Sequence, residues 1–448
     1  MRSSDQILDT LCGFLRIPSV STDPAHAADV RRAAEFVRQH LIGSGLSGAR
    51  LIEHTGNHPL VFGEWLGAEG KPTLLLYGHY DVQPPDPLNE WTTPPFEPAI
   101  RNQNIYARGA CDDKGQTLIL LEAVRRLMDR DGRLPINVKF LIEGEEEVGG
   151  EHISALVESK PDFLKADAAV ICDTEMFAAG IPTLCVGLRG IVYGELTVTG
   201  ADHDLHSGVY GGAAPNPIMA IAEILTALKD RDGHILIPRF YDHVVPPSQD
   251  ELDAWHSLPF DEKEYLKTEV GSTTLTGEPG FSVIERTWAR PTVEVHGIRG
   301  GFIGEGAKTV IPARAVAKLS MRLVANQDPA ECTRLLQEAV AEVCPRGVTA
   351  EYKAIHSGAP SLVNTDNEFI SKSAAAMAEV FGRKTVFIRS GGSIPITGLF
   401  DKHLGIPSVM MGFGLPDDNL HAPNEKFHLP NLYLGIDAMV KYFELLGR

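Results

Sequence analysis

Short apolar runs alternate with amphipathic stretches over the first 190 residues of the chain. Residues 73–77 form an apolar run ahead of Gly78, as is typical of a strand covered on both faces. Residues 114–130 place their apolar side chains at helical spacing instead. Strands that alternate with helices predict a mostly parallel sheet with helices on both faces, an α/β fold. Further strands are expected at 136–142 and 168–171, and further helices after Ser4 and around 30–41.

The pattern changes after Gly190. Residues 191–199 alternate between apolar and polar positions, which favours an antiparallel strand with one covered face. Asp328 and Pro329 form a good helix start, with a capping residue followed by proline in the first turn. Two strand–helix units on one sheet predict a small α+β domain of ferredoxin-like type. Its expected elements are strands at 191–199, 315–324 and 348–354, and helices at 217–228 and from Pro329 to near Cys344.

The α/β pattern returns after residue 357. A helix is expected near 368–380, a strand at 408–411 and a closing helix at 432–446. The outer segments, 1–190 and 358–448, therefore form the two parts of one predicted domain. The ferredoxin-like domain is inserted between them at 191–357. A chain of 448 residues is also too long for one ordinary core, in agreement with such a division.

Composition excludes several classes of partner. The formal net charge of −18 argues against binding to nucleic acid or to an anionic membrane surface. No apolar run of about 18 residues is available to span a membrane, and the N-terminus lacks the features of a signal peptide. The six cysteines show no CxxC pairing, so free thiols in a cytoplasmic protein are the simplest expectation.

Histidine and carboxylate side chains follow the predicted strands. Each has an ordinary structural explanation by itself: a solvated acidic loop, a helix cap or a structural histidine. Together they lie at the C-terminal ends of successive strands, where open α/β sheets build their sites. Two imidazoles and three carboxylates suit zinc, manganese or cobalt, and five ligands favour two ions that share a carboxylate and activate a water for hydrolysis. The candidates are His79, Asp81, Asp112, Asp113, Glu145, Glu146, Glu147, Asp173 and His421.

Seven ordered motifs give the chain a family resemblance. It resembles the acetylornithine deacetylase and succinyl-diaminopimelate desuccinylase superfamily of dinuclear metallohydrolases. Within that superfamily it is most similar to the branch of cytosolic nonspecific dipeptidase and carnosinase. The resemblance covers nearly the whole chain. The motifs are Gly78-His79-Tyr80-Asp81-Val82, Ala110 to Gly115, Glu143 to Gly149, Asp204 to Gly208, Lys308 to Pro312, Arg389 with Gly391 to Pro395, and His421.

The resemblance implies a role for each residue at the metal centre. Asp112 would bridge two divalent ions, with His79 and Asp173 completing one site and Glu147 and His421 the other. Zinc or manganese is expected, with cobalt possible. Asp81 would orient His79 from behind, and Glu146 would be the general base. Glu145 is expected to face solvent. Residues 422–425 differ from the carnosinase pattern and are expected not to touch the ligand.

The resemblance also implies that the inserted domain is a lid and the platform of a homodimer. His206 would reach the active site of the neighbouring subunit and stabilise the oxyanion. A second group would hold the C-terminal carboxylate of the substrate, a task suited to arginine. This group comprises Thr309, Arg322, Arg389 and Ser393. A surface ion pair is the structural alternative for Arg322.

Three functions remain open on the sequence alone. The leading one is a metal-dependent dipeptidase of broad specificity. The second is an amidohydrolase that removes an acyl or carbamoyl group from an amino acid with the same metal centre. The third, a non-catalytic peptide-binding relative, predicts the loss of the base or of ligands, whereas all the expected positions are filled.

Overall fold

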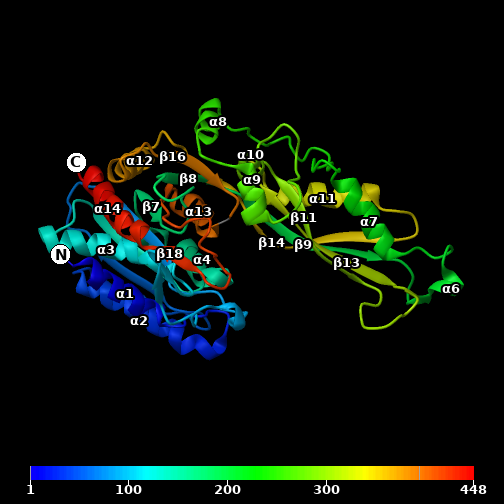
Figure 1. The fold of residues 1–448 in the computed structure, drawn as a ribbon, viewed down its shortest axis with the longest axis horizontal. Helices are drawn as coiled ribbons and strands as arrows, with labels where there is room; N and C mark the ends of the chain where they lie inside the picture. The colour runs from blue at the N-terminus through cyan, green and yellow to red at the C-terminus, as the bar shows by residue number, and fades with distance from the viewer. Residues whose placement is uncertain (1, 393) are drawn as a thin grey trace. The chain divides into compact units, whose positions relative to one another are not determined.

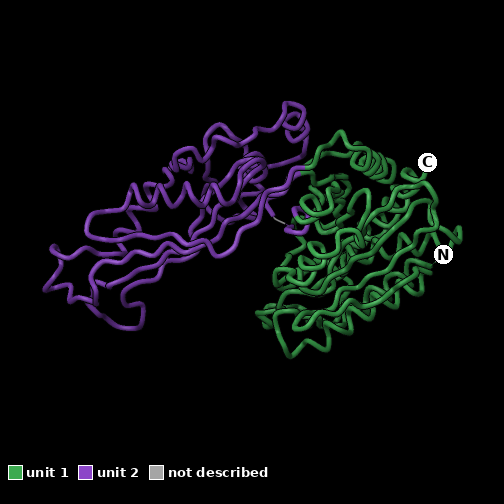
Figure 2. Tube along the Cα trace, turned by 180° about the vertical axis from the view of Figure 1, so that it is seen from behind, with its two compact units in different colours: residues 1–186, 363–388, 399–448 green, residues 187–362, 389–398 purple. Residues whose placement is uncertain are grey.

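The computed structural model describes residues 2–392 and 394–448. It divides into two compact units, drawn in different colours in Figure 2. Unit 1 comprises residues 1–186, 363–388 and 399–448, and unit 2 comprises residues 187–362 and 389–398. These bounds lie within a few residues of the expected changes at 190 and 357. Residues 389–398 differ, since they cluster with unit 2 and were expected in the outer domain.

A nine-stranded mixed sheet, most of whose residues belong to unit 1, forms the centre of that unit (Figure 1). Its strand order is β1-β2-β6-β3-β7-β17-β8-β15, and β16 also pairs with β8. The neighbours β6, β3, β7 and β17 are parallel, whereas β1, β2 and β6 pair antiparallel, as do β17, β8 and β15. The parallel strands are thus the inner part of a mixed sheet. The strands are β1 (Ser47–Ile52), β2 (Leu60–Trp65), β3 (Thr73–His79), β6 (Asn137–Glu143), β7 (Ala168–Ile171), β8 (Thr183–Leu188), β15 (Ser361–Leu362), β16 (Val386–Ser390) and β17 (Ser408–Met410).

Helices cover this sheet because each buries one apolar face against it or against a neighbouring helix. The first helix begins one residue before the expected start: Ser3 caps it, in a reciprocal capping box with Gln6. A three-stranded sheet, β18-β5-β4, lies in the same unit. The helices are α1 (Ser4–Leu15), α2 (Ala27–Gly43), α3 (Lys114–Asp131), α4 (Glu151–Ser159), α5 (Pro161–Leu164), α12 (Glu368–Phe381) and α14 (Leu429–Leu446); the small strands are β4 (Ala99–Arg101), β5 (Asn104–Tyr106) and β18 (Lys426–His428).

Unit 2 contains a four-stranded antiparallel sheet in the order β11-β13-β9-β14. Helices α7 and α11 contact its strands on one side, which gives the expected ferredoxin-like arrangement (Figure 1). Strand β11 was not expected, because most of its residues are exposed and it lacks a clear alternation. The elements are β9 (Gly190–Thr199), α7 (Pro217–Leu228), β11 (Thr292–Gly300), β13 (Arg314–Leu323), α11 (Pro329–Val343) and β14 (Thr349–Gly358).

Smaller elements complete unit 2. Strands β10 (Leu205–His206) and β12 (Val310–Ile311) form a separate two-stranded ribbon. Apart from α7, the segment between β9 and β11 was left unassigned by the sequence pattern, and short helices occupy parts of it. They are α6 (Ser207–Tyr210), α8 (Gln249–His256), α9 (Glu262–Tyr265) and α10 (Val283–Trp288), and α13 (Pro395–Leu399) follows β16.

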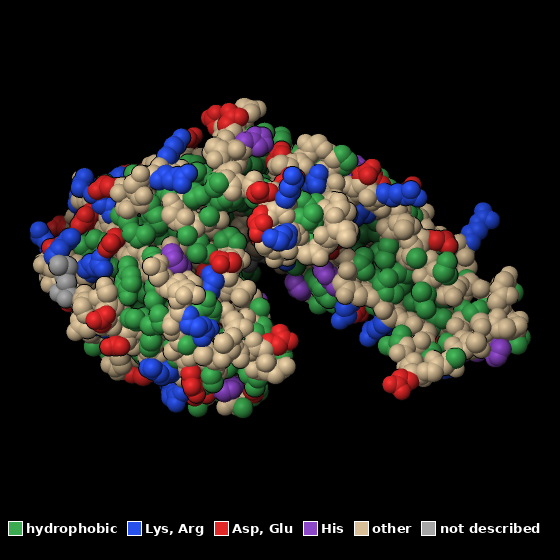
Figure 3. Space-filling model, viewed as in Figure 1, with side chains coloured by type: hydrophobic (Ala, Val, Ile, Leu, Met, Phe, Trp, Pro, Cys, Tyr) green, Lys and Arg blue, Asp and Glu red, His purple; other side chains and the backbone are tan. Residues whose placement is uncertain are grey.

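The face drawn in Figure 3 shows no region of a single dominant charge. Acidic and basic side chains are interspersed with hydrophobic ones on the face drawn in Figure 3. No helix within residues 2–392 and 394–448 is long and apolar enough to cross a membrane. No disulfide joins any of the six cysteines, all of which lie in the described part of the chain.

Candidate metal centre

The predicted ligands converge at one edge of the sheet in unit 1. His79 is the last residue of β3, and Asp173 follows β7 by two residues. Glu146 and Glu147 begin a 3₁₀ turn that is separated from the end of β6 by two residues, Gly144 and Glu145. These strands are parallel neighbours, so their carboxyl ends meet at the same edge. Asp112 approaches from the segment before α3, and His421 from the segment after β17.

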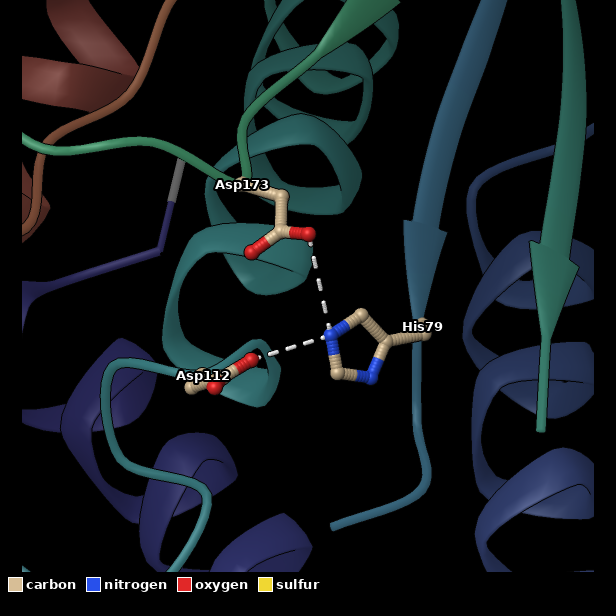
Figure 4. A group of neighbouring side chains, drawn as sticks. All are labelled: His79, Asp112 and Asp173. Carbon is tan, nitrogen blue, oxygen red and sulfur yellow. Dashed lines mark hydrogen bonds and ion pairs between the residues drawn. The ribbon is translucent and has the colours of Figure 1, made fainter. Parts of the chain in front are cut away.

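Asp112 lies between two groups of candidate ligands. Its Oδ1 lies 3.0 Å from Nε2 of His79, which is also 3.9 Å from Oδ2 of Asp173 (Figure 4). Its Oδ2 lies 2.9 Å from Nε2 of His421, which is also 3.4 Å from Oε2 of Glu147. Within each group the possible ligand atoms lie within 4.8 Å of one another. Each oxygen of the Asp112 carboxylate therefore faces a different histidine, as a bridging ligand requires.

The charges of these side chains favour bound cations. Burial raises the pKa of Asp173, and the nearby charge of Asp113 raises it further. Although burial alone would raise the pKa of Asp112, hydrogen bonds from His421 and His79 hold it below its usual range. Hydrogen bonds to Asp112 and Glu147 raise the pKa of His421 to about 10. Carboxylates gathered in this way repel one another unless positive charge neutralises them.

The donor set fits divalent metal ions. The atom Oε1 of Glu147 is buried and has no hydrogen-bond partner among the described residues, so it is available as a ligand. His79 is fully buried, and its Nδ1 faces the backbone oxygen of Asp81 at 3.1 Å and the Asp81 carboxylate at 3.4 Å. These contacts leave Nε2 of His79 pointing toward the Asp112 carboxylate. Asp81 thus has the geometry expected of a residue that orients a metal ligand.

Glu146 lies beside the two groups and belongs to neither of them. Burial raises the pKa of Glu146 to about 7, and the charges of Glu147 and Asp112 add to this shift while that of His79 opposes it. A carboxylate with a raised pKa next to a metal centre has the properties of a general base at neutral pH. Its role as the base stays a prediction.

Glu145 corrects one expectation. Its side chain is buried instead of facing solvent, with a relative exposure of 6%. It accepts hydrogen bonds from the backbone N–H groups of His58 and His152 and from the side chain of Asn57. A buried carboxylate keeps its charge only where such donors replace water. Glu145 therefore ties the turn after β6 to residues 57–58 and to the start of α4.

Two supporting residues were missed by the sequence analysis. Nε2 of Gln83 donates to Oε2 of Glu147 at 2.7 Å. Glu425 accepts a hydrogen bond from the backbone N–H of Asp112 at 3.1 Å, a contact that the sequence analysis did not predict. A signal existed for Gln83, which follows Asp81 by two positions in an extended segment. No local signal pointed to Glu425, because its partners lie over 300 positions earlier in the chain.

The remaining predicted site residues belong to unit 2. The β10–β12 ribbon pairs His206 with Val310, and the N–H of Ser207 donates to the backbone oxygen of Thr309. The structure thus brings His206 and Thr309 together. The N–H of Gly208 donates to Nδ1 of His206 at 3.0 Å. A neutral imidazole that accepts at Nδ1 carries its hydrogen at Nε2, so the exposed ring is a hydrogen-bond donor.

The two arginines lie on strands of different sheets. Arg322 is half-buried on β13, and burial lowers its pKa. Arg389 is buried at the end of β16, where its Nε and Nη2 donate to Oε1 of Glu251 at 3.0 and 2.7 Å. Its guanidinium lies over the Trp255 ring. Carboxylate binding by Arg389 would therefore compete with an existing acidic partner. Ser393 lies outside the described residues.

Comparisons with known proteins identify the family of the chain. The model of peptidase family M20/M25/M40 matches residues 75–445. Over 461 residues the chain is 32% identical to Cys-Gly metallodipeptidase dug1 of Schizosaccharomyces pombe, covering 100% of this chain and 96% of that protein. It is 32% identical to the human Beta-Ala-His dipeptidase, over 86% of this chain and 77% of the relative. A solved M20 family metallo-carboxypeptidase of Sulfolobus solfataricus superposes with a TM-score of 0.85 at 33% identity, covering 99% of each chain. The chain therefore belongs to peptidase family M20/M25/M40, a family of metallopeptidases.

Proposed function

We propose that this metallopeptidase hydrolyses dipeptides of broad sequence with two divalent metal ions. The observation that carries the proposal is the Asp112 carboxylate, whose two oxygens each face one histidine-containing ligand group. The relatives of similar length that are named dipeptidases support the choice of substrate. His79 and Asp173 would hold one ion and Glu147 and His421 the other, with zinc or manganese as the expected metal and cobalt as a possible one.

The residues of the chain divide the reaction between them. When bound, the two ions polarise the scissile carbonyl and activate the attacking water. Glu146 accepts the proton of that water on its carboxylate and delivers it to the leaving amine nitrogen. Asp81 keeps Nε2 of His79 directed toward the metal by holding the opposite ring nitrogen. His206, with its hydrogen at Nε2, donates to the oxyanion, a contribution of about 3–4 kcal/mol for one such donor.

Unit 2 supplies the proposed substrate contacts. Thr309 adjoins His206 through the β10–β12 ribbon, and Arg322 offers a planar fork for the C-terminal carboxylate of the substrate. Arg389 and Ser393 complete the set proposed from the sequence. For Arg389 this role requires that the substrate carboxylate displace Glu251.

A homodimer through unit 2 is part of the proposal. Strand β11 is an edge strand in the sheet order, and unpaired edges are ready to bind another strand. Large apolar side chains are exposed on it and just after it: Val295, Ile298, Phe302 and Ile303, the last at 86% relative exposure. Contiguous exposed apolar surface marks an interaction site. A second copy of the chain is the proposed occupant, in a cytoplasmic protein.

A substrate panel tests the function. Dipeptides, tripeptides, N-blocked dipeptides, N-acyl amino acids and N-carbamoyl amino acids are assayed with zinc, manganese and cobalt after chelation. Cleavage of unblocked dipeptides is expected to dominate. Cleavage of acyl or carbamoyl amino acids without dipeptides would instead establish the amidohydrolase alternative.

Carboxypeptidase activity is the second candidate, because the superposed Sulfolobus structure is that of a metallo-carboxypeptidase. A carboxypeptidase and a dipeptidase both need the carboxylate-binding residues at the C-terminal side. They differ at the other end of the substrate, where a carboxypeptidase accepts a blocked or extended chain. Equal kcat/KM for blocked and unblocked dipeptides would favour the carboxypeptidase.

Subunit mixing tests whether His206 acts across a dimer. His206→Ala and Glu146→Gln are each expected to be nearly inactive as homodimers. After the two are unfolded and refolded together, roughly a quarter of the wild-type activity should return, because half of the dimers are mixed and each holds one intact site. If activity stays at the level of the separate variants, His206 does not act in the partner subunit.

A further inference from the structure

The buried carboxylate of Glu425 receives four hydrogen bonds from one short segment of unit 1. Its relative exposure is 0%. Oε2 accepts from Nη1 of Arg108 at 2.7 Å and from the N–H of Gly109 at 2.8 Å. Oε1 accepts from the N–H groups of Cys111 at 2.9 Å and Asp112 at 3.1 Å. The backbone oxygen of Glu425 also accepts from the N–H of Ala107.

This segment has no regular secondary structure to fix its backbone. Residues 107–113 are turns and bends between β5 and α3, and Gly109 has a φ of +82°. The N–H groups of Gly109, Cys111 and Asp112 would have to be satisfied by water if Glu425 were absent. Glu425 supplies the hydrogen-bond acceptors that backbone oxygens supply in a helix or sheet. One of the N–H groups that it accepts from belongs to Asp112, the residue that faces both ligand groups.

Glu425 also lies four residues after His421 on the same segment. It therefore connects the backbone that carries Asp112 to the backbone that carries His421. Arg108 strengthens the connection, since its Nη2 donates to the backbone oxygen of Pro84 and its guanidinium lies over the Trp91 ring. Of the two ligand groups, the one with Asp112, Glu147 and His421 contains both connected residues.

We propose that Glu425 is a positioning residue that fixes Asp112 relative to His421 and thereby sets the affinity for the metal ion held by Asp112, Glu147 and His421. The inference rests on the metal-binding role of these residues in the proposed function. It assigns no contact between Glu425 and metal or substrate. Loss of a residue that orients metal ligands typically costs 10–100-fold in affinity.

The carboxylate form is required by the partners. A carboxylate only accepts hydrogen bonds, and here all four partners donate. A glutamine has the same shape, but its NH₂ group would face N–H donors on one side. Glu425→Gln should therefore release half of the contacts and let the Asp112 segment move.

The test compares Glu425→Gln with Glu122→Gln. Glu122 is also a buried carboxylate of unit 1; it lies in the middle of α3, pairs with Arg2 and has Nε2 of His40 at 3.5 Å from its Oε1. Thermal unfolding of the metal-free proteins measures the structural cost of each change. Stepwise Co²⁺ titration, followed by absorption spectroscopy and calorimetry, measures the two affinities separately.

Both variants are expected to unfold at lower temperature than the wild type. Only Glu425→Gln should bind one of the two Co²⁺ ions about 10–100-fold more weakly. Its kcat should recover in excess metal while the KM for a dipeptide stays close to the wild-type value. Wild-type affinities for both ions in folded Glu425→Gln, or equal weakening in Glu122→Gln, would overturn the proposal.

A milder variant keeps the proposal testable if Glu425→Gln does not fold. Glu425→Asp keeps the charge and the partner Arg108 but is one methylene too short to reach all four donors. It should show the same selective loss of affinity, smaller in size, and wild-type binding in this variant contradicts the proposal. If the wild-type protein itself binds no second ion, the fault lies with the dinuclear proposal and not with Glu425.

Discussion

Glu145, Glu146 and Glu147 are consecutive in the chain but lie in three different environments. One oxygen of Glu147 faces His421, and the other has no hydrogen-bond partner within residues 2–392 and 394–448. Glu146 lies beside the ligand groups, and burial raises its pKa to about 7. Glu145 is buried against backbone N–H groups of two other segments. One acidic run therefore contains a candidate ligand, a candidate base and a structural carboxylate.

These environments predict different effects of the same substitution. Glu146→Gln should lower kcat by about 10²–10⁴-fold, the usual contribution of a general base, while both metal ions remain bound. Glu145→Gln serves as the matched control: it should lower the free energy of unfolding by about 1–3 kcal/mol, because a buried acceptor is lost, with little change in kcat. Steady-state kinetics, metal analysis and urea unfolding measure the three quantities. Loss of metal from Glu146→Gln would show that the base and ligand roles are wrongly assigned.

At the scale of elements, helices α2 and α3 meet around a buried ionic cluster. His40 of α2 is buried, and its Nε2 lies 3.5 Å from Oε1 of Glu122 on α3. Arg2 also pairs with Glu122. Burial, together with the charges of Arg125 and Arg2, lowers the pKa of His40 to about 3. His40 is thus neutral in the folded protein at pH values where the unfolded chain would protonate it.

This shift makes stability depend on pH. Between about pH 3 and 6.5 the unfolded state binds more protons at His40 than the folded state does. The contribution of His40 to the free energy of unfolding is therefore complete above pH 6.5 and declines as the pH falls. The slope approaches about 1.4 kcal/mol per pH unit. Burial raises the pKa of Glu122, which gives an opposite slope above its ordinary value. The quantity to measure is therefore the difference in the free energy of unfolding between the wild type and His40→Asn, obtained from urea unfolding at pH 4, 5 and 7.

The stability difference between the two proteins should shift in favour of His40→Asn as the pH is lowered, because the variant has no group to protonate. A difference that stays constant from pH 7 to pH 4 would contradict a lowered pKa at His40. Asp417→Asn, which changes an exposed carboxylate, provides a control for general changes in charge.

At the scale of the whole molecule, the candidate metal centre brings together segments that are distant in sequence. Its candidate ligands come from positions 79 to 421, from the end of β3, from the segments after β6, β7 and β17, and from the segment before helix α3. Bound ions would hold these segments together and relieve the repulsion between their carboxylates. Metal binding should therefore contribute to global stability as well as to activity.

Chelation tests this expectation. At 100 times its dissociation constant, each ion adds about 2.7 kcal/mol to the free energy of unfolding. Removing both ions should lower Tm by several degrees and abolish dipeptide hydrolysis, and zinc, manganese or cobalt should restore both. Calorimetry and activity assays follow the two properties. An unchanged Tm after verified metal removal would mean that the ligand groups are held rigidly without the ions.

The sequence by itself determined the features that local order encodes. The inner strands, the long helices and the ferredoxin-like insertion follow from hydrophobic period and capping, which depend on residues a few positions apart. The candidate ligands followed from their places at the ends of strands, since parallel neighbours bring those ends to one edge. Strand β11 and the short helices before it were not predicted, because they bury few side chains and show no clear hydrophobic periodicity.

Only the tertiary structure decided which side chains support the ligands and which are already engaged. Glu425 meets Asp112 across 313 positions of the chain, and Arg389 meets Glu251 across 138. Glu145 was expected at the surface but is buried, because it too accepts hydrogen bonds from distant segments. A hydrogen bond between distant segments depends on how the whole chain packs, and no local pattern specifies the partner. The sequence predicted the candidate ligands, whereas packing determined which side chains support them.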